Sequence, residues 1–322
     1  MFSLTPRLAM LTAVFAFSSL NLAPSANAQT DAKINKTKSV APSKVKGLLY
    51  EIEIPATAAK EGDKKRALKV YLFGSIHVAR ADFYPMSPAV LKAYKQADTV
   101  VVEADVSNTE TSSEIVEKLS YASPDKLEKH LSPATWESLK SMTGPNIEQF
   151  QRFKPVMVAM GLTISIGQQL GFEPAQGIDL HFILQSRKDK KQLVELEGVS
   201  FQGNVLGDLS DAEGDALLAA ALDSVRKGEA PKELNRIAET WTQGDAAALG
   251  QILRDAGNRD AGSQALMKRL MDDRNAPMIE KIAKLAAEGK KLFVVLGAGH
   301  LAGDNSILHL MQKQAWQVKQ IR

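Results

Sequence analysis

Short apolar runs lie near the two ends of this chain, and long amphipathic stretches fill its middle. Four or more consecutive apolar residues are typical of a strand buried on both faces of a parallel sheet. A strict alternation of apolar and polar residues instead favours a strand with one solvated face. We place such a strand at an edge of the sheet. The predicted strands are Gly47–Ile54 (alternating), Ala67–Phe73, Thr99–Glu103, Gln192–Leu196, Lys291–Leu296 and Trp316–Ile321.

Helical signals dominate the rest of the chain. Ser or Thr followed by Pro suits a helix start, because the hydroxyl caps free backbone N–H groups and Pro fits the first turn. The predicted helices begin at Ser87-Pro88 (to Gln96), Ser112, Ser123-Pro124, Ser132-Pro133, within 147–170 (interrupted near Pro155), Leu180, Ser210 (nearly continuous to Ala287) and Asn305. This order predicts an α/β fold: a central, largely parallel sheet formed by strands from both ends of the chain, with a large helical insertion in the middle.

Two predicted strands end in the same motif. Val70–Ala79 (VYLFGSIHVA) and Phe293–Ala302 (FVVLGAGHLA) each have four apolar residues, then G-x-x-H, then an apolar residue and Ala. Gly at such a position lets the backbone turn sharply, and a positive φ at Gly74 or Gly297 would make Gly necessary there. A His then follows the carboxyl end of each strand, which is the edge where open α/β sheets bind ligands.

Glu103 is predicted to share that edge. The segment Ala67–Glu103 reads as strand, helix and strand, and its crossover is long enough to make the strands parallel. If the strand before His300 lies beside them, two imidazoles and a carboxylate converge, which is a common catalytic metal arrangement. His77, His300 and Glu103 are therefore candidate metal ligands. The alternative is that each His only hydrogen-bonds a loop carbonyl.

Other polar residues have weaker signals. Asp179 follows Gly-Ile at a helix start, where it either caps the helix or orients a metal-bound His. Arg274 and Asn275 lie within a predicted helical stretch. One interpretation is a solvated charged face; the other is that Arg274 reaches into a cleft, where it holds a carboxylate or stabilises an oxyanion. Two further histidines have structural readings: His130 at the surface and His309 in helix packing.

The N-terminus has the pattern of a secretory signal peptide. Arg7 precedes the apolar run Leu8–Leu20, and Ala26-Asn-Ala28 fits a cleavage site after Ala28. The apolar run is too short for the about 20 residues that a membrane span needs, and no later stretch suits one. We expect residues 1–28 to be removed, 29–46 to form a polar linker, 47–322 to form one domain, and the mature protein to be periplasmic or secreted.

Composition narrows the class further. The chain has no Cys, so its core must hold it together without disulfides. The formal net charge of +3 is too balanced to suggest a nucleic-acid partner. No G-x-S-x-G, H-E-x-x-H or Walker motif occurs, so those reaction classes lack their usual signatures.

Taken in order, the motifs resemble those of the TraB/GumN family. They are GSIH at 74–77 with TVVVEAD at 99–105, GID at 177–179, LE at 196–197 with Gln202, DRN at 273–275 and GAGHL at 297–301. That family includes the TIKI metalloproteases and is related to erythromycin esterase-like and ChaN-like folds. The resemblance implies that His77, His300 and Glu103 are the metal-site residues and that Arg274 and Asn275 are the motif Arg-Asn. One departure is Gln314-Ala315, where the family commonly has a Gly before the last strand.

These observations predict an exported metal-dependent hydrolase, of the TIKI-like protease type, acting on a peptide or protein. Mn²⁺, Co²⁺ and Zn²⁺ all suit nitrogen and oxygen ligands. The alternatives are a non-catalytic periplasmic protein that binds a metal, haem or glycan, and an accessory factor in polysaccharide export.

Overall fold

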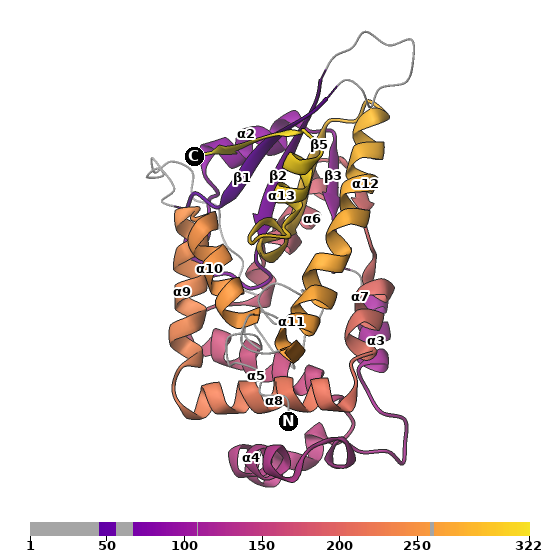
Figure 1. The fold of residues 1–322 in the computed structure, drawn as a ribbon, viewed down its shortest axis with the longest axis vertical. Coiled ribbons are helices and arrows are strands. Elements are labelled where there is room, and N and C mark those ends of the chain that lie inside the picture. The colour runs from indigo at the N-terminus through magenta and orange to yellow at the C-terminus, as the bar shows by residue number, and fades with distance from the viewer. Residues whose placement is uncertain (1–44, 56–66, 108, 258–260) are drawn as a thin grey trace.

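A six-stranded mixed sheet forms the upper half of the molecule (Figure 1). The computed structural model describes residues 45–55, 67–107, 109–257 and 261–322. The strand order is β4-β3-β5-β2-β1-β6. The four strands from β4 to β2 run parallel, whereas β1 is antiparallel to both β2 and β6. The strands are β1 (Leu48–Ile54), β2 (Leu68–Ser75), β3 (Thr99–Val102), β4 (Gln192–Glu195), β5 (Leu292–Gly297) and β6 (Gln317–Ile321).

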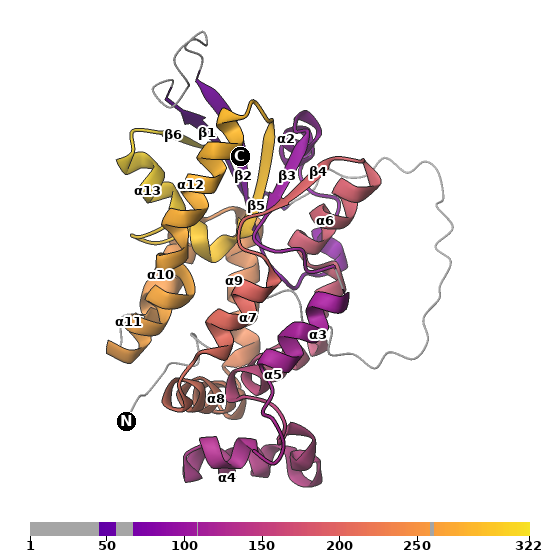
Figure 2. The ribbon, with the colours of Figure 1, turned by 90° about the vertical axis from the view of Figure 1, so that its right-hand side faces the viewer.

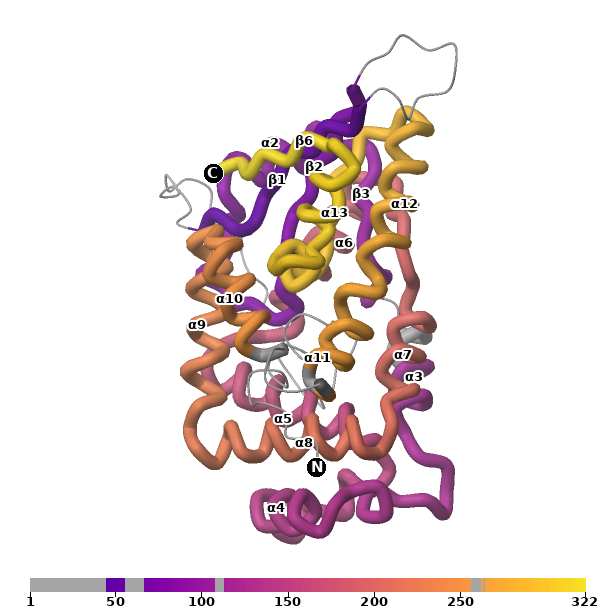
Figure 3. Tube along the Cα trace, in the orientation of Figure 1, coloured from indigo at the N-terminus to yellow at the C-terminus, as the bar shows by residue number. Residues whose placement is uncertain are grey.

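Helices cover the sheet and build the lower half of the molecule (Figure 3). The α-helices are α2 (Pro88–Gln96), α3 (Thr109–Lys118), α4 (Pro133–Thr143), α5 (Pro155–Gln169), α6 (Ile178–Lys188), α7 (Val199–Gly207), α8 (Asp211–Arg226), α9 (Ala230–Gln243), α10 (Ala246–Gly257), α11 (Ala261–Met267), α12 (Asp273–Ala287) and α13 (Ile307–Lys313). Short helical turns are η2 (Ala81–Phe83), η3 (Leu127–His130), η4 (Gly144–Phe150), η5 (Pro174–Gln176), η6 (Lys268–Asp272, a π-helix) and η7 (Ala298–Leu301).

The two faces of the sheet are covered by different parts of the chain. Figure 2 shows α2 and α6 on one face and α12 and α13 on the other. The helical half below is built from α3 to α5 and α7 to α11 (Figures 1 and 2). The fold is therefore the predicted α/β arrangement: strands from both ends of the chain form the sheet, and the middle of the chain supplies most of the helices.

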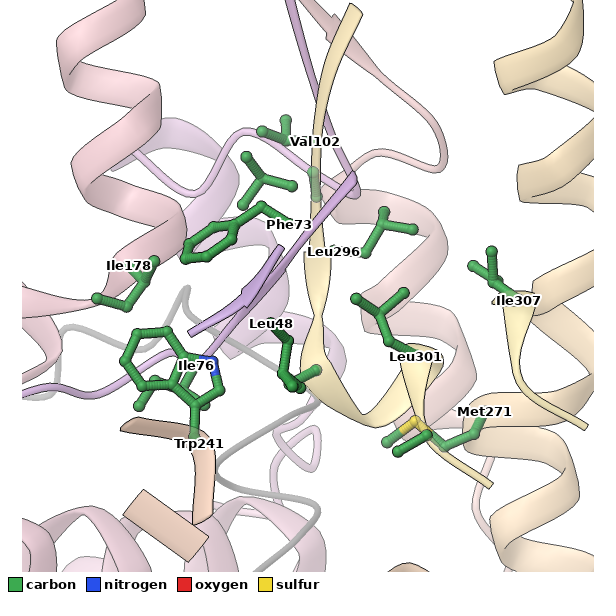
Figure 4. Packing of buried hydrophobic residues seen from close by; sticks show 14 of the residues in the cluster. Leu48, Phe73, Ile76, Val102, Ile178, Trp241, Met271, Leu296, Leu301 and Ile307 are labelled. Atoms are coloured by element: carbon green, nitrogen blue, oxygen red, sulfur yellow. The ribbon is translucent and has the colours of Figure 1, made fainter. Parts of the chain in front are cut away.

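The sheet and the helical half are joined through a packed aromatic core. Trp241 of α9 is fully buried and donates its indole N–H to the carbonyl of Gly74 at 2.8 Å. Phe73 stands 6.1 Å from the Trp241 ring in an edge-on contact. Figure 4 shows both rings in one apolar cluster with Leu48, Ile76 and Ile178. This packing fixes the end of β2, from which the first G-x-x-H loop departs.

Several local predictions need correction. β1 is not an edge strand, because β6 pairs along its outer side; β6 and β4 are the edges. Ser123-Pro124 does not open a helix but lies in a turn before η3. Neither motif glycine has a positive φ: Gly297 has φ −50° and ψ 130°, and Gly74 is also outside the left-handed region.

Gly74 is required by close packing instead. A Cβ added there would lie 3.0 Å from Leu301 Cδ1, 3.1 Å from Leu48 Cβ and 3.3 Å from Ala298 Cα. Figure 4 shows Leu48 and Leu301, two of the residues that such a Cβ would meet. The absence of a side chain therefore lets the second G-x-x-H loop pack directly against β2.

The predicted signal peptide (1–28) and most of the predicted linker (29–46) fall in residues 1–44, which lie outside the described residues. Among the helices that the structure describes, none combines the length and apolar character that a membrane crossing requires.

Candidate functional site

β5 brings the two G-x-x-H loops together. This strand lies between β2 and β3 and runs parallel to both. Ser75 at the end of β2 pairs with Gly297 at the end of β5. His77, His300 and Glu103 therefore follow three neighbouring strands at one sheet edge.

His300 is completely buried and has a defined tautomer. Its Nδ1 lies 2.7 Å from Asn275 Oδ1, while the Nδ2 of the same amide donates to the carbonyl of Asn305 at 2.8 Å. Because the amide NH₂ is directed at that carbonyl, Asn275 Oδ1 accepts from His300 Nδ1–H and leaves Nε2 with its lone pair. Burial, reinforced by the Arg274 charge, lowers the pKa of His300 to about 3, so the ring is neutral.

His77 is held in a similar way by a carboxylate. Its Nδ1 lies 2.9 Å from Asp179 Oδ2, and both side chains are buried. Asp179 does not cap α6, since Gly177 is the N-cap residue and no side-chain cap bond forms there. Of the two readings offered for Asp179, the geometry matches the one in which it orients a histidine. A carboxylate accepting from Nδ1–H fixes the ring so that Nε2 points away as an acceptor.

Glu103 is fixed at the centre of the site by donors from three elements. Its Oε1 accepts the backbone N–H of Gly297 at 2.6 Å. Its Oε2 accepts from Gln202 Nε2 at 3.0 Å and from Arg274 Nη2 at 2.8 Å. His300 Nε2 stands 3.9 Å from the same Oε2. Glu103 and His300 are thus neighbours, with the lone pair of the imidazole near the carboxylate.

Arg274 is buried and fully engaged with the protein. Its guanidinium binds Glu197 through Nε (2.8 Å) and Nη2 (2.6 Å), binds Glu103 through Nη2, and donates from Nη1 to the carbonyl of Leu270. Arg274 therefore does hold carboxylates, but they are the protein's own. The alternative of a solvated helix face is wrong for both Arg274 and Asn275, which are 3% and 1% exposed.

A π-helix precedes these two residues. The segment Lys268–Asp272 has π-helical hydrogen bonding and leads directly into α12 at Asp273. Such wide turns occur often at functional sites, where they change the direction in which the following side chains point. Here the π-helix precedes the first turn of α12, in which Arg274 contacts Glu103 and Glu197, and Asn275 contacts His300.

A cavity of about 10 Å³ opens beside His77 and Glu103, and this is close to the least space that holds one water molecule. Its lining residues are Ser75, His77, Val102, Glu103, Ala104, Val106, Asp179, Gln202 and Val295. The side chains that surround the reactive groups are all nearly excluded from solvent. The site therefore admits only very small groups in this conformation.

The donor set suits a divalent cation in chemistry, although it is not preassembled. Two imidazoles whose Nδ1 atoms are hydrogen-bonded can offer Nε2 to an ion. Together with a nearby carboxylate they are ordinary ligands for Mn²⁺, Co²⁺ or Zn²⁺. The carboxyl groups of Glu103 and Glu197 share the guanidinium of Arg274, and the carboxyl group of Asp179 contacts His77, so these three carboxyl groups have one guanidinium among them and the site can take further positive charge. Among the described residues, no three His, Asp or Glu side chains already converge at coordination distance.

Reasoning from the sequence did not assign roles to Glu197 and Gln202. Glu197 lies two residues beyond β4, just as Glu103 follows β3, and its backbone N–H donates to the carbonyl of Glu103 at 2.9 Å. A carboxylate just past the end of a predicted strand is the signal that could have found it. Gln202, from the first turn of α7, contacts both carboxylates.

His130 and His309 differ from their predicted settings. His130 is half-buried rather than free at the surface, with Nε2 2.8 Å from Asp125 and Nδ1 2.9 Å from Asp211. His309 is exposed on α13, so the reading that placed it in helix packing is wrong. Both lie apart from the residues around Glu103.

Comparison with known proteins finds the same family that the motifs resemble. The sequence model of the TraB/PrgY/gumN family matches residues 58–320. Uncharacterized protein YbaP of Escherichia coli (strain K12) is 27% identical over 245 residues, covering 75% of this chain and 87% of that protein. An uncharacterized protein of Treponema pallidum (strain Nichols) is 20% identical over 259 residues, covering 76% of this chain and 77% of that protein. No solved structure matches the chain significantly.

Proposed function

The chain belongs to the TraB/PrgY/gumN family, and from its buried site we infer that it is an exported metal-dependent hydrolase that cleaves peptide bonds. One observation carries the proposal. Two histidines from equivalent motifs have their Nδ1 atoms fixed by Asp179 and Asn275, at a sheet edge shared with Glu103. This is the arrangement that outer hydrogen bonds give to metal-binding imidazoles.

His77, His300 and Glu103 would hold the ion. A bound Mn²⁺, Co²⁺ or Zn²⁺ supplies a Lewis acid that polarises a carbonyl group. Asp179 and Asn275 hold the two imidazoles in the tautomer that presents Nε2. Arg274 and Gln202 keep Glu103 in place, and Arg274 partly balances the charge of Glu103 and Glu197.

The residues also define the hydrolytic step. A water oxygen forms a bond to the substrate carbonyl carbon, the C–N bond breaks, and a proton from the water reaches the leaving amine. Glu103 would accept and pass on that proton through the carboxylate oxygen that does not bind the ion, because it is the carboxylate next to the two histidines. Burial of these groups strengthens each electrostatic interaction at the reacting atoms.

Enclosure of the site favours a second candidate, a periplasmic protein that binds a metal without catalysing hydrolysis. His77, Glu103 and His300 are no more than 6% exposed. The adjoining cavity is far too small for a haem or a sugar, so a metal is the ligand that this alternative retains. For the hydrolase, the same enclosure requires that the loops around the site open to admit a peptide.

Export is part of the proposal and rests on the N-terminal pattern ending at Ala28. N-terminal sequencing of protein recovered from the periplasm or medium is expected to begin at Gln29. Residues 1–28 retained in a membrane fraction would contradict it.

Activity is tested by digesting a peptide library with the mature protein, with and without a chelator. We expect cleavage that the chelator abolishes and that Mn²⁺, Co²⁺ or Zn²⁺ restores. The variant Glu103→Gln should be inactive, and His309→Ala, which alters an exposed residue, should cleave at the wild-type rate. Bound metal without any cleavage would support the binding protein instead.

A further inference from the structure

Ser75 places a buried hydroxyl in the same cavity as His77 and Glu103. It is the last residue of β2, two positions before His77, and it is 1% exposed. Its side chain lines the cavity together with those of Glu103 and Gln202. Its Oγ makes no hydrogen bond to any other group that the structure describes.

Such a hydroxyl calls for an explanation. A buried polar group without a hydrogen bond destabilises a protein, and native proteins contain few of them. Ser is not required at this position by strand formation, since strands favour β-branched and aromatic residues. Ser75 Oγ makes no hydrogen bond to either imidazole, so it is not an activated nucleophile of the Ser-His type.

The cavity has the size and the polarity for one water molecule. Its volume of about 10 Å³ is near the lower limit for a water, and a held water needs two to four polar partners. Ser75, His77, Glu103, Asp179 and Gln202 all contribute polar side chains to the lining. A hydroxyl can both donate a hydrogen bond to a water and accept one from it. An ionised carboxylate can only accept one.

We propose that Ser75 is a positioning residue that hydrogen-bonds the water which attacks the substrate. This inference rests on the proposed hydrolase function and deepens it. The backbone that carries the hydroxyl is held in place at the end of β2: Ser75 pairs with Gly297 of β5, and the carbonyl of the preceding Gly74 accepts a hydrogen bond from Trp241. The bond sets the direction in which the water approaches a carbonyl, and no bond to Ser75 itself is made or broken.

Ser75→Ala tests the role, with Ser224→Ala as the matched control. Ser224 is also 1% exposed and its Oγ also lacks a hydrogen bond to the described residues, but it lies in α8, away from the lining of the cavity. Neither change removes a hydrogen bond within the described protein, so both variants are expected to fold. Crystal structures, bound metal per chain and digestion of the peptide library are compared for wild type and both variants.

In the wild type we expect a water about 2.5–3.0 Å from Ser75 Oγ. Ser75→Ala should displace that water and slow cleavage about 10- to 100-fold with KM within a factor of two, since misplacing a reactant by about 1 Å has effects of that order. Metal per chain should stay at the wild-type value in Ser75→Ala, and Ser224→Ala should match the wild type throughout.

Three results would overturn the inference alone: no water within hydrogen-bond distance of Ser75 Oγ, an active wild type with Ser75→Ala equally active, or loss of the metal in Ser75→Ala. The last would show that Ser75 supports the shape of the site rather than a water. A wild-type protein that neither binds metal nor cleaves peptide contradicts the proposed function itself, and the role of Ser75 fails with it.

Discussion

Replacing Arg274 by Met should strongly destabilise the fold, because Arg274 is the cation that pairs with two buried carboxylates. Its side chain is 3% exposed, and those of Glu103 and Glu197 are each 7% exposed. The shortest contacts are 2.8 Å to Glu103 and 2.6 Å to Glu197. Met keeps most of the volume and removes the charge.

The expected loss of unfolding free energy in Arg274→Met follows from the burial of Arg274 and its two carboxylates. Removing one partner of a buried ion pair typically costs about 3–5 kcal/mol, because it leaves the other charge unpaired. That is a large part of the about 5–15 kcal/mol by which native proteins are stable. Adding Glu197→Gln to Arg274→Met removes one of the two unpaired carboxylates, so the double variant should recover part of the loss.

Urea unfolding followed by circular dichroism measures the free energy of unfolding of each variant, with the slope m checked for constancy. Arg269→Met is the matched control, since Arg269 binds Glu213 at 2.9 Å with side chains 36% and 24% exposed. Such a partly exposed pair contributes about 0–1 kcal/mol. A cost for Arg274→Met within about 1 kcal/mol of the control would refute the reasoning.

Three further changes test other parts of the structure by the same unfolding assay. Ala315 holds a left-handed φ of 63°, so Ala315→Gly should raise stability, by up to about 1 kcal/mol, and an unchanged or lower value would contradict the strain. Gly74→Ala should lower stability by about 1–3 kcal/mol through overpacking, and a wild-type value would show that its neighbours yield freely. Burial acts to lower the pKa of His130, but its bonds to Asp211 and Asp125 outweigh this and raise it. The stability lost in His130→Ala should therefore be largest below about pH 6.5 and shrink as pH rises through the folded-state pKa; a loss that grows with pH would contradict this sign.

The sheet was predictable from the sequence because its strands carry local signals. The apolar runs of β2, β3 and β5 are each followed by Gly or Glu. A strand–helix–strand connection within one sheet makes its two strands parallel and has a fixed handedness. The prediction that β1 is an edge strand was wrong. An alternating apolar and polar pattern indicates that one face of a strand is solvated, but it does not indicate whether a further strand pairs alongside it. The turn before β6 formed without its usual Gly, with Ala315 taking the left-handed conformation.

Part of the candidate site could also be predicted from the sequence, and part could not. Residues just past strand ends could be placed at one edge, because parallel strands bring their carboxyl ends together. Asp179 could be named as a residue that orients a histidine, and Glu197 carries the same strand-end signal as Glu103. The pairing of Asn275 with His300 and of Arg274 with Glu103 could not be read from the sequence, since tertiary contacts decide how the helix that carries Arg274 and Asn275 packs. Mid-helix Arg and Asn look like a solvated face until the π-helix before them is known.

The metal content of the purified mature protein tests the central claim most directly. If His77 and His300 hold one divalent ion, elemental analysis after exchange into metal-free buffer should find one Mn²⁺, Co²⁺ or Zn²⁺ per wild-type chain. His77→Ala and His300→Ala should each contain less than a tenth of that amount while retaining the wild-type circular dichroism spectrum, and His309→Ala should contain the full amount. A wild-type protein that stays free of metal after incubation with all three ions would contradict the account, and so would full metal content in either site variant.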